Sequence, residues 1–463
     1  ERLAEALDGA ARAPRERGSS MDQWGADDQW RLFFCDREAR RNARAGLELR
    51  APVLQVWHQD LECSYAGPRW EAGAPSFFTF PWLSRARARR DVRRGAERGG
   101  GREERGPRPI MTDLRDGDVI MGGEGKLAAA LEAGLASGER VEAVVVESTC
   151  VPTVIGDDVP KALRALRDRI GVPLIYSSAA ANQQVDVGRL LLERVRTEPG
   201  WGRGRTIPSS VNLIGFPEGA ALDEMKTLLE RAGVRVHVAA MPSLTLEQAR
   251  ALPRAAAQVF LPNAAYEPIY EAVFRTIPVP AHSFDAPYGA AGTRRWLRAV
   301  AGLFGREAAA ERAAEEAFAP ALPRWNELRR EAAGRRLAFV VDRERLPRLT
   351  DPSRFWGVPV LRVLREFGLG VEVLLHGAKD RGPLKGFSTP DELSRLLSEG
   401  RFDAVYSEYF FDDRLVRAGK AQFSLGFFEP GLRGAVATLE RLLASARWGF
   451  YRRYADAFRA EGA

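Results

Sequence analysis

The feature that most constrains the fold of this chain is a repeated alternation of short apolar runs with helical stretches. One series begins near Thr112, a second at SVNLIGF (210–216) and a third at RLAFVVD (336–342). Short apolar runs bounded by turns predict buried parallel strands, and the stretches between them return the chain by right-handed crossovers. The alternation therefore predicts an α/β protein with three Rossmann-like, doubly wound parallel-sheet domains.

Changes in composition predict the domain boundaries. Residues 1–108 form a cysteine-bearing N-terminal segment that ends in an Arg/Gly-rich loop, and α/β domain 1 covers 109–205. Domain 2 covers 206–334 and domain 3 covers 335–463. Domain 2 is predicted to end in one long Ala/Glu/Arg spacer helix, 306–333.

Composition is that of a soluble globular protein, with 463 residues, 45% hydrophobic and 28% charged. The sequence has no apolar run of transmembrane length, so no membrane partner is expected. Three cysteines, an odd number, argue against a secreted disulfide framework and predict a cytoplasmic protein. The amino end lacks a signal core and does not start with Met, so residues 1–20 are interpreted either as natural sequence or as a tag ahead of Met21.

The positive charge is concentrated in one loop. Net charge is +7, and much of the excess lies in 85–108, RARARRDVRRGAERGGGREERGPR. Because no aromatic residues interleave with these arginines, the pattern favours a solvated loop over a nucleic-acid arm. We therefore expect no nucleic-acid partner.

One cysteine stands at the end of a predicted strand. In VEAVVVESTCVPTVIGDDVPK (141–161), Ala143–Val146 is an apolar run that predicts a buried strand, and Cys150 follows it. After a turn, Asp158 is a good helix N-cap and Pro160 suits the first helical turn. Ligands bind at the carboxyl ends of strands in open α/β sheets, so a thiolate there is well placed for chemistry.

The segment before it invites a phosphate-loop interpretation, which fails. DVIM (118–121) predicts a strand and GGEG a turn before a helix. A Walker loop needs a Gly separated by four residues from its Gly-Lys pair and a Ser or Thr after the pair, but Ile120 and Leu127 stand there. The dinucleotide pattern fails at Ala128, which replaces its third Gly. An ordinary glycine turn is favoured.

Few other chemistries are encoded. The sequence has no GxSxG, HExxH or CxxC motif, and its four histidines are widely scattered. The spacing of Cys35, Cys63 and Cys150 alone favours three separate buried thiols. The alternative is that they converge on an iron–sulfur cluster. A cubane takes about four ligands, so the fourth would come from another chain or from an oxygen ligand beside a cysteine: Asp36, Ser64 or Ser148.

Two segments resemble a known family. TDLRDGDVIMGGEGKL (112–127) and VVVESTCVPTVIGDDV (144–159) are similar to the component 1 proteins of nitrogenase and nitrogenase-like reductases, which include subunits of protochlorophyllide and chlorophyllide reductases. That family carries Thr-Asp-x-x-x-x-Asp-Ile/Val-x-x-Gly-Gly-x-x-Lys-Leu, then Ser/Thr-Cys before a turn ending Ile-Gly-Asp-Asp. Weaker similarity at 278–297 and 429–443 extends the resemblance over about 110–450.

The resemblance implies a cluster held by three cysteines per subunit at an interface between like subunits. Cys150 matches the third family cysteine, and Cys63 the second, because WHQDLECSY keeps His58 and the thiol. The segment departs from the family's His-Gly-Pro-x-Gly-Cys at Gln59, Asp60 and Glu62. Cys35 matches the first by position. With all three on family positions, the resemblance favours Cys35, Cys63 and Cys150 as ligands of a [4Fe–4S] or P-cluster-like centre shared with a partner subunit.

The resemblance also implies a function. The family's α-type subunit binds a large catalytic metallocluster through one further Cys and one His, but neither occurs near Val259–Pro262 or Gln422–Phe428. The chain therefore resembles a β-type subunit of an ATP-dependent reductase, paired with an α-like subunit in a heterotetramer and supplied with electrons by a dimeric iron–sulfur ATPase. A metallocluster assembly scaffold and a homologue without a cluster are the alternatives. No catalytic residue or substrate is assigned.

Overall fold

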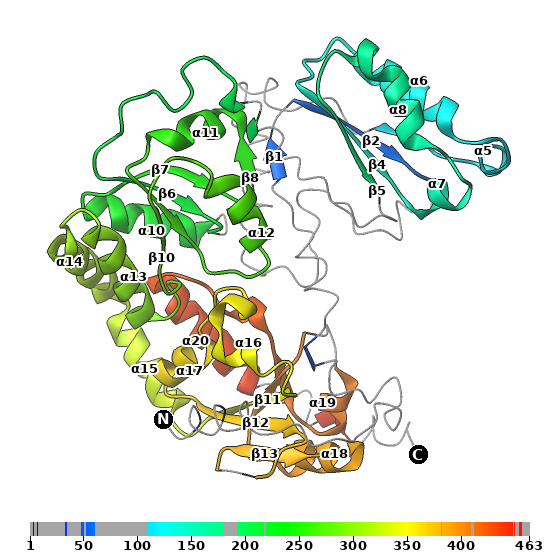
Figure 1. Cartoon of the computed structure of the whole chain (residues 1–463). Coiled ribbons are helices and arrows are strands. Elements are labelled where there is room, and N and C mark those ends of the chain that lie inside the picture. Colours follow the sequence, from blue (N-terminus) through cyan, green and yellow to red (C-terminus); the bar gives the residue numbers. More distant parts are fainter. Residues whose placement is uncertain are drawn as a thin grey trace.

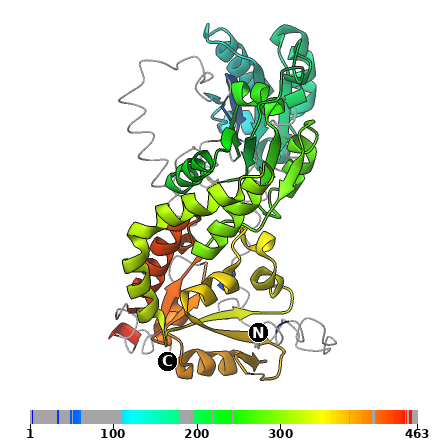
Figure 2. The same ribbon diagram turned by 90° about the vertical axis from the view of Figure 1, so that its left-hand side faces the viewer.

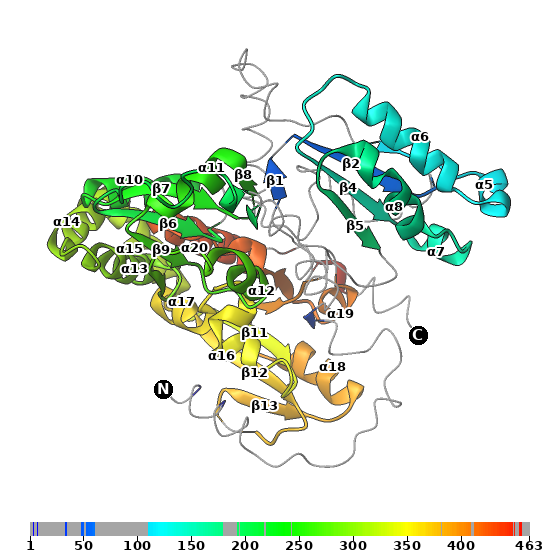
Figure 3. The same ribbon diagram turned by 45° about the horizontal axis from the view of Figure 1, so that its top comes forward.

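The computed structural model describes the chain at residues 3, 7, 33–34, 48–50, 52–60, 110–178, 192–193, 195–216, 219–241, 243–380, 382–408, 412–447, 449 and 453–455. Within these ranges, three parallel sheets lie in three lobes with helices on their faces (Figures 1 and 3). The predicted α/β class is confirmed. Among the described helices, none combines the length and apolar character needed to cross a lipid bilayer.

The first sheet has four parallel strands in the order β3-β2-β4-β5: β3 (Ile110–Met111), β2 (Val53–His58), β4 (Ala143–Ser148) and β5 (Leu174–Ser178). β2 comes from the N-terminal segment and pairs with β4 at the register His58 to Ser148. The helices α6 (Glu124–Leu135) and α8 (Val159–Ile170) cover one face, where apolar side chains of β2 and β4 are buried. The strand predicted at 143–146 is confirmed as β4.

The start of α8 also agrees with its prediction. The carboxylate of Asp158 accepts a hydrogen bond from the Lys161 N–H at 2.9 Å and caps the helix, with Pro160 in the first turn. The short helix α7 (Cys150–Val154) fills the connection between β4 and this cap. The Cys150 segment is therefore fixed between a buried strand and a capped helix.

The second sheet has the order β10-β9-β6-β7: β10 (Ala281–Ser283), β9 (Ala257–Phe260), β6 (Ser210–Ile214) and β7 (Arg235–Ala240). Its helices are α10 (Ala220–Arg231), α11 (Leu246–Ala251), η4 (Leu252–Arg254), α12 (Glu267–Ile269), η5 (Tyr270–Phe274) and α13 (Ala290–Gly302). A short parallel pair, β1 (Glu48–Arg50) with β8 (Ser243–Thr245), ties the N-terminal segment to this lobe. The face of the first sheet opposite α6 and α8 shares a hydrophobic cluster with the second lobe, in which Val145 and Ile175 join Ile214.

The third sheet has the order β13-β12-β11-β14-β15: β13 (Leu384–Phe387), β12 (Gly370–His376), β11 (Arg336–Val341), β14 (Ala404–Tyr406) and β15 (Ala421–Phe423). Its helices are α16 (Pro347–Thr350), η7 (Pro352–Phe355), α17 (Val360–Phe367), α18 (Pro390–Glu399), α19 (Asp413–Arg417), η8 (Leu425–Phe427) and α20 (Leu432–Arg447). The strands predicted to open the second and third series, within 210–216 and 336–342, are confirmed as β6 and β11.

Residues ahead of the first sheet pack into the third lobe. Phe33 and Phe34 are fully buried, and the Phe34 ring stacks on Tyr406 with 4.7 Å between centroids. The Phe33 carbonyl accepts a hydrogen bond from the Glu408 N–H at 3.1 Å. Leu7 is fully buried in the same core.

Two predicted elements are wrong. The run predicted as a strand at 118–121 lies in the helix α5 (Asp116–Met121). The carboxylate of Asp118 accepts from the Arg115 N–H at 2.7 Å and closes the first turn, so local hydrogen bonds decide the conformation. The apolar side chains that suggested a strand are exposed and pair with no sheet.

The spacer helix predicted over 306–333 is broken into α14 (Glu307–Phe318), the 3₁₀ turn η6 (Ala319–Ala321) and α15 (Leu322–Ala332). Pro320 and Pro323 lack the N–H that a continuous helix needs, and each stands in the first turn of a new element. Figure 2 shows these helices running from the second lobe towards the third.

Candidate functional site

Cys150 lies at the carboxyl end of β4, where its prediction put it. It opens α7, its side chain is exposed, and it carries a free thiol. The neighbouring strand β2 ends at His58, and the His58 carbonyl accepts a hydrogen bond from the Thr149 N–H at 3.3 Å. The thiol therefore stands at the mouth of two adjacent central strands, an edge that binds ligands in open α/β sheets.

Cys35 and Cys63 lie outside the described residues, so their ligation stays a prediction. The described chain after β2 extends to Asp60, which forms an isolated bridge with Leu114. Within the described ranges, no group of three or more His, Cys, Asp or Glu side chains could hold a metal ion. Of the three candidate cysteines, Cys150 alone lies among the described residues, at the edge of the first sheet.

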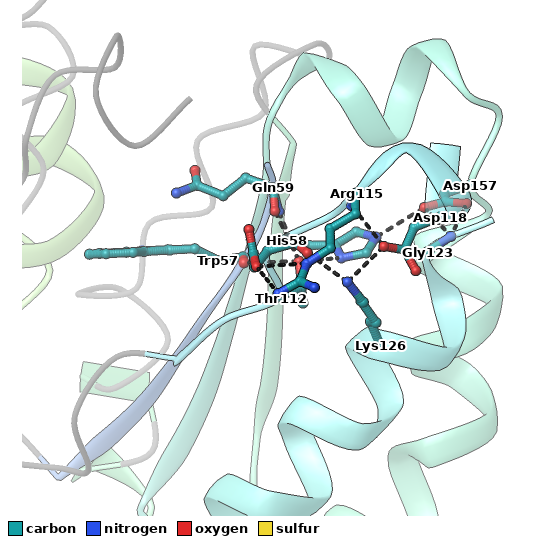
Figure 4. A network of polar contacts seen from close by, with 10 residues as sticks. Trp57, His58, Gln59, Thr112, Arg115, Asp118, Gly123, Lys126 and Asp157 are labelled. Carbon is teal, nitrogen blue, oxygen red and sulfur yellow. Dashed lines mark hydrogen bonds and ion pairs between the residues drawn. The ribbon is translucent and has the colours of Figure 1, made fainter. Parts of the chain in front are cut away.

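A buried polar network connects His58, at the end of β2, with Asp157, at the end of the turn that Cys150 begins (Figure 4). His58 Nε2 is 3.1 Å from Asp157 Oδ2, and the Gly123 N–H donates to both carboxylate oxygens of Asp157, at 2.9 and 3.1 Å. The His58 side chain is fully buried and that of Asp157 is 2% exposed. The network joins the end of β2, the turn before α6 and the end of the Cys150 turn.

A neutral His58 ring fits both the burial of the side chain and its hydrogen-bond partners. Burial lowers the pKa of His58 below its ordinary value, although Asp157 acts in the opposite direction. A neutral ring that donates from Nε2 to Asp157 leaves Nδ1 as an acceptor, and the Thr112 hydroxyl lies 3.2 Å from Nδ1. The same hydroxyl accepts from the Gln59 N–H at 3.1 Å. One neutral tautomer thus satisfies both ring nitrogens of His58, and it directs the single hydroxyl proton of Thr112 to Nδ1 instead of the Gln59 carbonyl, 3.2 Å away.

Gly123 is required by close packing. A Cβ there would lie 2.6 Å from Leu114 Cδ2, 2.8 Å from Asp157 Oδ2 and 2.9 Å from His58 Cε1. Three residues later, Lys126 Nζ donates to the Asp113 carbonyl at 2.6 Å and pairs with Asp118 at 2.7 Å. The contacts of the Gly-Gly-x-x-Lys segment therefore hold the turn before α6 against Asp157, Asp113 and Asp118. This structural role agrees with the failed phosphate-loop test.

Sequence reasoning identified Cys150 but missed this network. His58 is the last residue of β2. Asp157 ends the turn that follows β4, the strand paired with β2. The available signal was that polar residues following two predicted parallel strands meet at one edge.

Apolar side chains are exposed on α5 and at the end of α7, the helix that begins with Cys150. Val119, Ile120 and Met121 on α5 are 44%, 81% and 85% exposed, and Val154 at the end of α7 is 83% exposed. The described part of the chain has six exposed large hydrophobic side chains, and these are four of them. Figure 1 shows α5 and α7 at the same end of the first lobe. We call these four side chains the apolar cluster; large exposed apolar patches occur at protein contact surfaces.

One buried hydroxyl near Cys150 has no hydrogen-bond partner. Thr149 is the N-cap residue of α7, yet its side chain does not cap the helix, and its Oγ1 is buried without a partner among the residues described. N-cap threonines normally accept from the first helical turn. An iron–sulfur centre is held by thiolates and tuned by hydrogen bonds to its sulfurs, so an exposed thiol next to an unused donor fits such a group.

These features coincide with a family assignment. Residues 85–409 match the family described as nitrogenase component 1 type oxidoreductase, which covers more than half of the chain. The chain belongs to this family, as the two resembling segments predicted.

Relatives with curated names are more distant. A nitrogenase iron-molybdenum cofactor biosynthesis protein NifE of Rhizobium meliloti is 28% identical over 331 residues, 64% of this chain and 65% of that protein. The NifE of Rippkaea orientalis is 30% identical over 44% of each chain. A nitrogenase molybdenum-iron protein alpha chain of Methanosarcina barkeri is 26% identical over 27% of this chain and 25% of that one. Each alignment spans less than two thirds of the relative's length.

The fold is shared with a solved structure. Nitrogenase Cp1 at pH 5 superposes with a TM-score of 0.57, at 15% identity, over 89% of this chain and 88% of the other. At this identity the likeness concerns the fold alone, and it agrees with the three-sheet architecture.

Proposed function

We propose that this chain holds an iron–sulfur cluster at the Cys150 edge of the first sheet, as one subunit of a component 1-type complex. The observation that carries the proposal is the exposed Cys150 thiol at the mouth of β2 and β4, in a chain of this family. When bound, the cluster supplies one-electron storage. The chain's own residues ligate it and set its surroundings.

The other two ligands come from the N-terminal segment. Cys63 follows Asp60 by three residues, a length that spans about 10 Å at most. Asp60 lies two residues after the end of β2, the strand next to β4. Cys35 follows Phe34, which is buried in the third lobe. For Cys35 to ligate the same cluster as Cys150, the edge of the first sheet must therefore meet a third lobe, either that of the same chain or that of a partner subunit. Three cysteines leave one position of a cubane for a partner or an oxygen ligand.

Iron content tests the ligand set. After anaerobic purification, or reconstitution with iron and sulfide, the wild-type chain should be brown and contain iron and labile sulfide. Cys150→Ala should lose the colour, and Cys63→Ala and Cys35→Ala test the other ligands one at a time. Thr153→Ala, an exposed change in the same turn, is the matched control. A colourless wild type, or a Cys150→Ala variant with full iron content, contradicts the proposal.

The proposed partner that delivers electrons is a dimeric iron–sulfur ATPase. Its docking surface would be the apolar cluster of Val119, Ile120, Met121 and Val154, because these are four of the six exposed large apolar side chains of the described residues and Val154 ends the helix that Cys150 begins. Short distance between docked cluster and bound cluster is what electron transfer needs. We expect an α-like subunit to complete the cluster on the same edge of the sheet.

A pair of charge substitutions tests this surface. Ile120→Asp and Met121→Asp should weaken ATP-dependent reduction of the bound cluster by the ATPase, measured by electron paramagnetic resonance, and leave iron content unchanged. Leu322→Asp places the same charge at an exposed leucine on α15 and should have no effect. Equal behaviour of all three variants rejects the apolar cluster as the docking site.

The relatives favour a second candidate function, a scaffold for metallocluster assembly. Two of the relatives compared are cofactor biosynthesis proteins by name, and one is an alpha chain. The alpha chain does not favour the β-type assignment, which stays a prediction. A scaffold transfers its cluster to an apo-acceptor protein, whereas an electron relay oxidises and reduces its cluster repeatedly without losing iron. Iron counted in the chain and in an apo-acceptor after incubation with the ATPase, ATP and dithionite separates the two.

A further inference from the structure

The turn that begins at Cys150 closes on Asp157. The Ile155 N–H donates to the Val151 carbonyl at 3.0 Å, and the Asp157 N–H donates to the Pro152 carbonyl at 2.9 Å. Seven residues after Cys150, the backbone is therefore still hydrogen-bonded to the first turn of α7. Asp157 ends this turn just before the N-cap of α8.

The side chain of Asp157 attaches the turn to two other segments. Its carboxylate contacts His58 Nε2 at the end of β2 and accepts from the Gly123 N–H before α6. At the other end of the turn, the His58 carbonyl accepts from the Thr149 N–H. Cys150 therefore lies between two attachments to the same residue, one through the backbone of His58 and one through its ring.

We propose that Asp157 is the positioning residue of Cys150: its carboxylate, joined to His58 and Gly123, fixes the direction of the thiol at the edge of the first sheet. The role in cluster binding rests on the proposed function, whereas the effect on the thiol does not. Without the carboxylate, the Gly123 N–H and His58 Nε2 lose their acceptor, and of the two attachments to His58 the turn keeps only the backbone one.

The first test uses the metal-free protein. Asp157→Ala and His58→Gln should each change the alkylation rate of Cys150 by iodoacetamide several-fold, read by mass spectrometry of its peptide, and speed amide exchange over 150–156. Asp157→Asn keeps the shape and one acceptor, so its effect should be smaller. Asp158→Ala is the matched control, because it removes the cap of α8 at the next residue and contacts neither His58 nor Gly123.

A second readout separates positioning from simple destabilisation. In the iron-loaded protein, Asp157→Asn should shift the midpoint potential and the paramagnetic spectrum, whereas Asp158→Ala should lower thermal stability and leave both unchanged. If Asp157→Ala does not fold, Asp157→Asn and His58→Gln give the same comparison. Alkylation and exchange that match the Asp158→Ala control overturn the proposal. A wild type without iron rejects the proposed function but leaves the metal-free comparison decisive for Asp157.

Discussion

The carboxylate of Glu366, on α17 of the third lobe, accepts a hydrogen bond at 3.0 Å from the Ala291 N–H, which begins α13 in the second lobe. The reverse relation also occurs, because Glu224 on α10 of the second lobe accepts from the Arg433 N–H at the start of α20, at 3.2 Å. Each carboxylate satisfies N–H groups that a first helical turn leaves free and lies at the positive end of the helix dipole. Two reciprocal caps thus join the second and third lobes.

The caps should contribute measurably to stability. Glu366→Ala and Glu224→Ala should each lower the free energy of unfolding of the joined lobes by about 1–2 kcal/mol, the cost of a lost cap with unsatisfied N–H groups. Urea unfolding followed by tryptophan fluorescence is suitable, since Trp296 and Trp325 lie in the shared core. Glu327→Ala, which breaks an exposed pair with Arg324, is the control and should cost less than either cap variant. Equal losses in all three variants would contradict the role of the caps.

The same pair predicts a pH dependence. Burial raises the pKa of Glu224 and of Glu366 above the ordinary 4.5, although backbone N–H groups act in the opposite direction. The folded state therefore binds more protons than the unfolded state above pH 4.5, and stability should fall as pH rises from there through the raised pKa values. Urea midpoints measured across this window should decline in the wild type. The double variant Glu224→Gln, Glu366→Gln should flatten that decline, and an unchanged slope would refute it.

The strands could be predicted because burial on both faces makes them continuous apolar runs. RLAFVVD and SVNLIGF became β11 and β6, whose side chains are almost all buried. The same signal failed at Val119–Met121, where apolar side chains are exposed in a helix. An apolar run predicts a buried strand only where its side chains are apolar because they are buried. Exposed apolar side chains can instead form a contact surface for another protein.

The site could be predicted only in part. Cys150 was found because a strand, a turn and an N-cap are all encoded within twenty residues of sequence. The His58–Asp157 contact joins residues 99 positions apart, and its partner Gly123 contributes a backbone N–H that no side-chain pattern reveals. Such a network depends on strand order, which places β2 beside β4.

Gly123→Ala tests the packing of the network. The new methyl group would overlap Leu114, Asp157 and His58, so the turn before α6 must move. We expect a loss of about 1–3 kcal/mol of folding free energy, with faster amide exchange in the Cys150 turn. Gly125→Ala, two residues later in the same helix start, meets nothing within 4 Å and should be neutral or slightly stabilising. Similar stability of the two variants would show that the turn adapts without cost.

Thr149→Val removes the buried hydroxyl beside Cys150 and keeps the shape of the side chain. Because Oγ1 has no partner in the part of the chain described, its removal should stabilise the metal-free protein by about 1 kcal/mol. In the iron-loaded protein the expected result is opposite in kind: a hydroxyl that donates to a cluster sulfur favours the reduced state, so Thr149→Val should lower the midpoint potential and Thr149→Ser should restore it. Thr153→Val, at an exposed position in the same turn, controls for the added methyl. A more stable metal-free variant with an unchanged potential would assign Thr149 a purely structural cost. A lowered potential would identify the hydroxyl as part of the cluster's surroundings.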